Sequence, residues 1–185
     1  DNSSFVASAT STHTFGGSFV LGTNATFTPA SSTIVMNATT TGKQLSAPTT
    51  LSFYDLDFSG VGGGWSLDTD LSLENDMQIL AGTVIGTGDI TLPNGSLTGN
   101  GVLSMTGGTT TVATSTTLGG TSAWTFHNLQ LGDGLFAGTT TPAFTSTTTI
   151  GGTLTIATAH YLDAGNTNWN LAGTGTVFIE DGTFL

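Results

Sequence analysis

The stretch GTGDITLPNGSL, residues 86–97, matches GTGTVFIEDGTF, residues 173–184, without a gap, at an offset of 87 residues. Both segments open with Gly-x-Gly, and both then place apolar residues at alternate positions, with Ile90 in the place of Val177 and Leu92 in the place of Ile179. An alternation with period 2 is typical of a β-strand with one buried face. Each strand is followed by an Asn-Gly or Asp-Gly pair, which favours a turn. The match therefore predicts a repeated unit of short strands and tight corners.

Two further matches occur in the same order along the chain. Residues 71–82 (LSLENDMQILAG) match 154–165 (LTIATAHYLDAG) at an offset of 83 residues. Residues 53–60 (FYDLDFSG) match 126–134 (FHNLQLGDG) at an offset of 73. Three matches in one order indicate a diverged duplication.

The matches divide the chain into five parts. We expect an extended N-terminal arm over 1–14, which is a candidate inter-subunit strand, and first coils over 15–50. The two repeat halves are expected at 51–105 and 124–185, joined by a Thr/Gly-rich connector at 106–123.

Repeated strands of this kind predict an all-β fold, a parallel β-helix or β-solenoid. A strand with one apolar face is buried when successive coils stack on it, and the handedness of crossover connections predicts right-handed coils. The alternative is an antiparallel β-sandwich, pilin-like with strand donation, because Asn94-Gly95 and Asp181-Gly182 are also typical hairpin turns. The alternation predicts this inward ladder: Phe53, Leu56, Phe58, Leu71, Leu73, Ile79, Ile90, Leu92, Phe126, Leu129, Leu131, Leu154, Ile156, Leu162, Val177 and Ile179.

The charge balance excludes several partners. The 185 residues hold twelve acidic side chains and one basic side chain, Lys43, for a formal net charge of -11. Such a chain cannot neutralise phosphates, so we expect no nucleic-acid partner. Its apolar runs are far shorter than the ~20 residues that span a bilayer. The absence of Cys excludes disulfides and thiol chemistry.

The stretches ATFTPASSTIVMNATTTGKQLSAPTTLSFYDLDFSG (25–60) and WSLDTDLSLENDMQILAGTVIGTGDITL (65–92) resemble the Thr/Gly-rich repeats of adhesin-like bacterial cell-surface proteins. This resemblance implies an extracellular or surface-anchored structural protein and brings no catalytic residues with it. We therefore expect no enzyme. The expected partners are other copies of the chain, adjacent repeats, and host or cell-surface glycans.

The acidic residues are the candidate metal ligands. Asp55 and Asp57, like Asp68 and Asp70, are i, i+2 pairs that point to one face of a strand. Carboxylate oxygens so placed suit Ca²⁺, or the acid and base of a β-helix glycoside hydrolase or lyase. The alternative interpretation is a solvated anionic face, and we expect no resident cofactor.

Other side chains suggest contacts with glycans. Trp65 follows GVGGG, which favours an exposed ring that stacks on a sugar and so a carbohydrate-binding module. Asn2, Asn24, Asn37 and Asn94 begin N-x-S/T sequons and are candidate N-glycosylation sites. His13, His127 and His160 share no spacing, and we expect them to be structural.

The two ends of the sequence are apolar and predict self-assembly. The segment 176–185 is strand-like, and the uncovered end of a solenoid can recruit another strand. We expect the joining residues to be Phe5, Val6, Phe178, Phe184 and Leu185. A head-to-tail contact of this kind does not close and forms a filament or stalk.

Overall fold

The computed structural model describes residues 3–165, 167–172, 175–180 and 183–184. These residues form 26 strands and no helix. The strands stack in parallel as a β-solenoid of about eight turns, which confirms the predicted fold. An antiparallel sandwich is excluded because the described strand pairs are parallel, so Asn94-Gly95 forms a corner between coils and not a hairpin.

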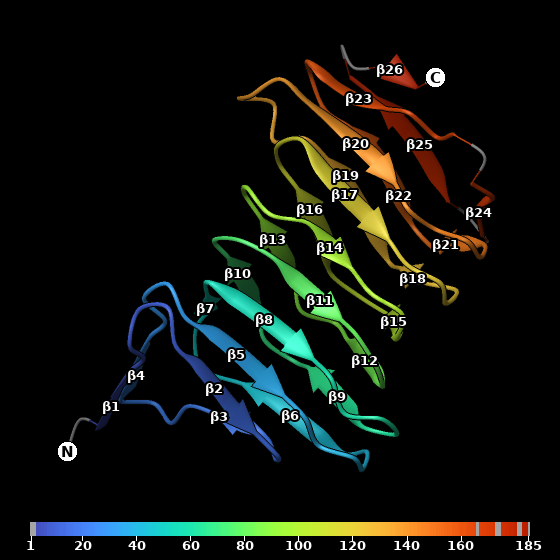
Figure 1. Cartoon of the computed structure of the whole chain (residues 1–185). Helices are drawn as coiled ribbons and strands as arrows, with labels where there is room; N and C mark the ends of the chain where they lie inside the picture. The colour runs from blue at the N-terminus through green and yellow to red at the C-terminus, as the bar shows by residue number, and fades with distance from the viewer. Residues whose placement is uncertain (1–2, 166, 173–174, 181–182, 185) are drawn as a thin grey trace.

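Three faces run along the solenoid, and the chain visits them in a fixed order (Figure 1). The first face contains β1 (Ser3–Val6), β4 (Ala25–Thr28), β7 (Leu51–Phe53), β10 (Leu71–Leu73), β13 (Ile90–Leu92), β16 (Thr109–Val112), β19 (Asn128–Leu131), β22 (Thr153–Ile156) and β25 (Thr176–Ile179). The second face contains β2 (Thr12–Phe15), β5 (Thr33–Met36), β8 (Asp55–Phe58), β11 (Met77–Ile79), β14 (Leu97–Thr98), β17 (Thr116–Gly119), β20 (Gly138–Pro142), β23 (His160–Leu162) and β26 (Thr183–Phe184). The third face contains β3 (Phe19–Val20), β6 (Lys43–Ser46), β9 (Gly64–Leu67), β12 (Thr83–Gly86), β15 (Val102–Met105), β18 (Thr125–Phe126), β21 (Thr148–Ile150) and β24 (Trp169–Leu171).

One strand from each face makes a coil, so eight coils begin with β1, β4, β7, β10, β13, β16, β19 and β22. Strands β25 and β26 follow the eighth coil. The first pair, β1 and β4, forms its own small sheet. It continues the first face because the rings of Phe27 and Phe53 lie 5.4 Å apart. The expected N-terminal arm thus contains β1 and β2, which pair with β4 and β5 of the same chain.

The register shows that the unit of repetition is one coil. Leu71 pairs with Ile90, and Ile90 pairs with Thr110, so these coils are 19 and 20 residues long. Four coil-to-coil steps, of 20, 19, 25 and 23 residues, lead from Ile90 to Val177 and explain the offset of 87. The offset of 73 has another origin, because Phe53 lies on the first face and Phe126 on the third. That match therefore aligns strands from two different faces that share a similar alternation, and these strands are not at equivalent positions of the solenoid.

Alternation fills the interior with apolar columns. Fourteen of the sixteen residues of the predicted inward ladder are at most 3% exposed. The two others, Val177 and Ile179, stand in register with Leu154 and Ile156 but are each 46% exposed. They continue the inward column, and no described coil covers them, which corrects the expectation that they are buried.

Candidate functional site

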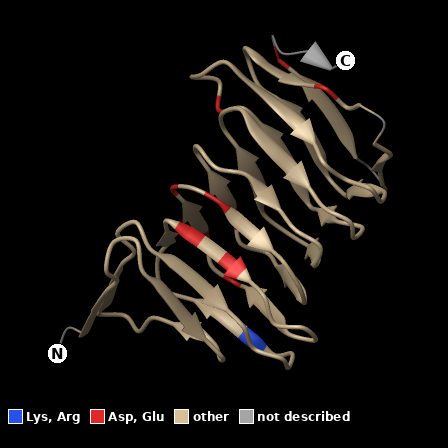
Figure 2. Cartoon of the chain, in the orientation of Figure 1, with Lys and Arg blue, Asp and Glu red and all other residues tan. Residues whose placement is uncertain are grey.

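Most of the acidic residues lie in the middle coils of the solenoid (Figure 2). Asp55 and Asp57 both point outward from β8, as their spacing predicts, and are partly exposed. The register of β8 with β11 places Asp76 beside Asp55, one coil further along the chain. Three carboxylates therefore lie together at the start of the second face.

Two of these carboxylates connect successive coils. Oδ1 of Asp55 accepts hydrogen bonds from the backbone N–H of Asp76 at 3.1 Å and from Nδ2 of Asn75 at 2.7 Å. Oδ1 of Asp76 in turn accepts from the backbone N–H of Ser96 at 2.7 Å. A charged acceptor strengthens such bonds. The carboxylates thus satisfy N–H groups at the start of the next strand.

A similar column stands at the start of the first face. Oδ1 of Asp70 accepts from the backbone N–H of Asp89 at 2.9 Å, and Oδ1 of Asp89 accepts from that of Thr109 at 2.7 Å. Further along, Oδ1 of Asn128 accepts from the N–H of Thr153 at 2.9 Å. Corner side chains of this chain therefore hold neighbouring coils in register.

The two candidate metal pairs are not brought together. Asp55 and Asp57 lie on the second face, whereas Asp68 and Asp70 lie in the corner between the third and first faces. Asp68 accepts a hydrogen bond of 2.6 Å from the hydroxyl of Ser66. Within the described part of the chain, no group of three or more His, Asp or Glu side chains is arranged to hold a metal ion. The observed role of three of these carboxylates, Asp55, Asp68 and Asp70, is to accept hydrogen bonds.

Asp57 is in an unfavourable electrostatic position. Burial raises the pKa of its carboxyl above the ordinary value of 3.8, and the charges of Asp55 and Asp76 raise it further. The folded chain thus binds a proton here more readily than the unfolded chain, so the ionised carboxylate lowers stability at neutral pH.

We expect Asp57→Asn to raise the free energy of unfolding at pH 7, by less than about 1 kcal/mol because the group is partly solvated. The gain should shrink as the pH falls toward 4, where the carboxyl of the unmodified chain takes up its proton. Urea unfolding at pH 7 and pH 4 measures both effects. Glu74→Gln, at an exposed carboxylate of the next coil, is the control, with a change within about 0.5 kcal/mol. A loss of stability in Asp57→Asn at pH 7 would contradict this.

His160 is enclosed in the C-terminal coils. Its side chain is 0% exposed, and its Nε2 lies 2.9 Å from Oγ1 of Thr140. Its Nδ1 is buried without a hydrogen-bond partner. Burial lowers the pKa of the imidazole below the ordinary value of 6.5, and Asp133 offsets part of this effect.

Because this pKa is lowered in the folded state, the unfolded chain binds more protons as the pH falls below about 6.5, and stability declines. We expect His160→Gln to flatten the dependence of unfolding free energy on pH between about 6.5 and 5. Chemical unfolding at several pH values measures the slope. His127→Gln, at an exposed position, is the matched histidine replacement with which the slope of His160→Gln is compared. Equal slopes in the unmodified chain and in His160→Gln would show that His160 does not cause the decline.

Trp65 is buried and cannot stack on a sugar. Its side chain is 1% exposed, and its ring packs against Phe58 with centroids 5.1 Å apart. Nearby glycines make room for the ring: Gly63 lies shortly before Trp65 in the sequence, and Gly82 lies in the following corner. A Cβ on Gly63 would lie 2.5 Å from Cη2 of Trp65, and one on Gly82 would lie 2.8 Å from Cζ3. This corrects the expectation of an exposed ring.

The sequons fall at corners of the solenoid. Asn24, Asn37 and Asn94 are exposed, between β3 and β4, β5 and β6, and β13 and β14 respectively. Asn2 lies outside the described residues. The three described side chains are thus accessible to a glycosylating enzyme.

The candidate joining residues lie toward the two ends of the stack. Val6 is 64% exposed, whereas Phe5 is partly covered by Phe27, with ring centroids 5.4 Å apart. Phe178 points outward from β25 and is 54% exposed. The backbone of Phe184 pairs with β23, and Leu185 lies outside the described residues.

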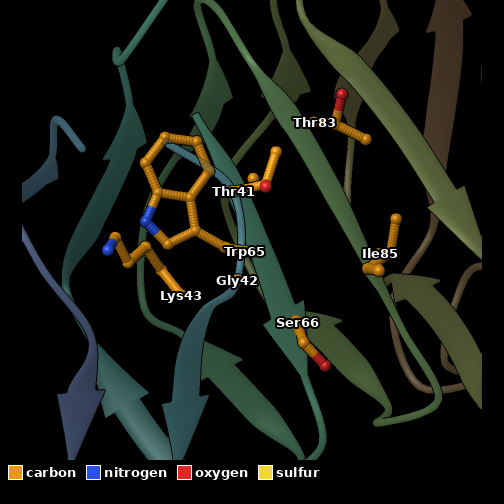
Figure 3. A pocket seen from close by; sticks show the side chains of 8 residues that line it. Thr41, Gly42, Lys43, Trp65, Ser66, Thr83 and Ile85 are labelled. Atoms are coloured by element: carbon orange, nitrogen blue, oxygen red, sulfur yellow. The ribbon is translucent and has the colours of Figure 1, made fainter. Parts of the chain in front are cut away.

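A shallow hollow lies on the third face, between strands β6, β9 and β12 (Figure 3). Its volume is about 250 Å³, and its walls are mainly apolar. Gly42 and Gly64 contribute no side chain, while Thr83, Ile85 and Lys43 stand around the space. Sequence reasoning missed this hollow, because it depends on which residues of three coils become neighbours.

The described residues include no helix long and apolar enough to span a membrane. Comparison with protein-family models, with curated proteins and with solved structures finds no match for the chain. The geometry of the solenoid therefore supplies the argument for function.

Proposed function

We propose that this chain is a structural segment of an extracellular filament, fibre or adhesin stalk, and that its stack of coils continues end to end in the assembled protein. The observation that carries the proposal is the uncovered column of β25. Val177 and Ile179 continue a buried column, yet each is 46% exposed.

The exposed column favours a further coil. The corresponding residues of the preceding coil, Leu154 and Ile156, are at most 3% exposed because β25 covers them. Full burial of an aliphatic side chain contributes roughly 1.5–3 kcal/mol, so covering two half-exposed side chains favours stacking. The outer edge of β25 also offers backbone groups for strand addition. A coil of a second copy provides the apolar side chains and backbone groups that cover this column.

The surface composition suits a mechanical role. Only 7% of the residues are charged, and the corner carboxylates that connect coils are occupied with backbone N–H groups. A stack with nearest-neighbour contacts of this kind forms a stiff, one-dimensional rod. The resemblance to adhesin-like repeats supports an extracellular location for such a rod.

A charge placed in the uncovered column tests the proposal. We expect the unmodified chain to form rods several chains long in negative-stain electron microscopy, and Val177→Asp to reduce their number at least tenfold at equal concentration. Val61→Asp is the control, because Val61 is 78% exposed on a turn away from β25. Rods of unchanged length in Val177→Asp, or an unmodified chain that remains single at every concentration, would refute end-to-end stacking.

A further inference from the structure

An apolar projection stands at the corner between β19 and β20. This corner, residues 132–137, carries Leu135 and Phe136, which are 79% and 60% exposed. Oδ1 of Asp133 accepts hydrogen bonds from the backbone N–H groups of Leu135 at 2.9 Å and of Phe136 at 3.2 Å. The two apolar side chains are therefore presented on a turn that is already ordered. We name residues 133–137 the knuckle.

The hollow on the third face is an apolar receptor of suitable size. Its volume of about 250 Å³ exceeds the ~150 Å³ of an engineered cavity that binds benzene, so one phenyl ring fits in it. Ile85, which is 46% exposed, forms part of its wall. We name this hollow between β6, β9 and β12 the third-face hollow.

The knuckle and the hollow lie on opposite sides of one chain. In a solenoid with three faces, the corner between the first and second faces is opposite the third face. The knuckle belongs to the seventh coil, and the hollow spans the second to fourth coils. Each chain can therefore donate one contact and accept another, and such a heterologous contact continues without closing. Neighbouring chains would be displaced by about four coils, or roughly 19 Å along the axis.

Charge favours a second copy as the occupant. The chain has a formal net charge of -11, which opposes self-association in general. Its single basic residue, Lys43, lines the hollow, and an acidic residue, Asp133, lies at the base of the knuckle. An attractive pair thus exists where these two surfaces would meet.

We propose that Phe136 of one copy inserts into the third-face hollow of another copy, with Leu135 at the rim of the hollow and Asp133 beside Lys43. This lateral contact joins rods side by side and does not require end-to-end stacking. It therefore goes beyond the proposed function and can be tested apart from it.

The test uses the full chain with Val177→Asp, so that end-to-end stacking is suppressed. Phe136→Ser removes the knuckle contact, and Ile85→Asp blocks the hollow. In sedimentation velocity we expect each variant alone to lose association at least tenfold. An equimolar mixture of the two should form a 1:1 dimer and nothing larger, because one intact knuckle then meets one intact hollow.

Two controls sharpen the result. Val61→Ser, at an exposed residue that lines neither surface, should associate like the chain that carries Val177→Asp alone. Lys43→Gln should weaken association about two- to fivefold and reduce its dependence on salt, as for a partly exposed ion pair. The proposal is overturned if the chain that carries Val177→Asp alone stays single at all concentrations. It is also overturned if the mixture of the Phe136→Ser and Ile85→Asp variants forms no dimer. The same holds if both variants associate as strongly as the chain that carries Val177→Asp alone.

Discussion

Gly95→Ala is expected to lower the free energy of unfolding by about 3 kcal/mol or more, since extra volume at a close-packed position costs typically 1–3 kcal/mol and sometimes more. A Cβ at this position would lie 1.7 Å from the carbonyl oxygen of Asn75 and 2.1 Å from its carbonyl carbon. Both are backbone atoms of the preceding coil, so no side-chain rotation relieves the overlap. The two coils would have to move apart, which would also strain the hydrogen bond from Ser96 to Asp76.

Urea unfolding monitored by circular dichroism measures this loss. Gly22→Ala is the matched control, because a Cβ there would meet nothing within 4 Å. We expect Gly22→Ala to change stability by less than about 1 kcal/mol. If Gly95→Ala proves as stable as the control, the coils are not stacked as closely as the structure shows.

Phe53→Ala is expected to destabilise the chain by about 3–5 kcal/mol, the range for a large aromatic residue removed from a core. Phe53 is 0% exposed on β7, and its ring lies 5.5 Å from that of Phe19 and 5.4 Å from that of Phe27, centroid to centroid. Its removal leaves a cavity where the aromatic rings of three coils meet.

Phe178→Ala is the matched control, because it removes the same side chain from β25 of the same face, where the ring is 54% exposed. Its effect should remain within about 0.5 kcal/mol, when thermal unfolding is followed at a concentration low enough to prevent association. Equal losses in the two variants would show that the assignment of inward and outward positions is wrong.

The sequence predicts the alternation well and the assignment of faces poorly. Inward positions follow from period 2, and fourteen of the sixteen predicted ladder residues are buried. The offsets of 87 and 83 are true four-coil steps. The offset of 73 is not, because every face uses the same short apolar alternation and the same corner residues. Local similarity therefore cannot identify which face a strand occupies.

The contacts between neighbouring coils were the hardest feature to predict from the sequence. Asp55 and Asp57 are recognisable as a pair on one face, but the hydrogen bond from Asp76 to Asp55 depends on a coil length of 21 residues at that point. The environment of Trp65 likewise depends on Gly82, which belongs to the following corner. A flanking glycine run looks the same in sequence whether it exposes a ring or makes room for it.

Negative-stain electron microscopy of the unmodified chain tests the central claim most directly. One chain with nine levels of strands on its first face has a length of roughly 40 Å, at about 4.8 Å per level. Continued stacking predicts rods of constant width that are several times this length, and these end-to-end rods are lost with Val177→Asp. Single-chain particles of the unmodified protein at every concentration, or rods that Val177→Asp leaves unchanged, would contradict the account.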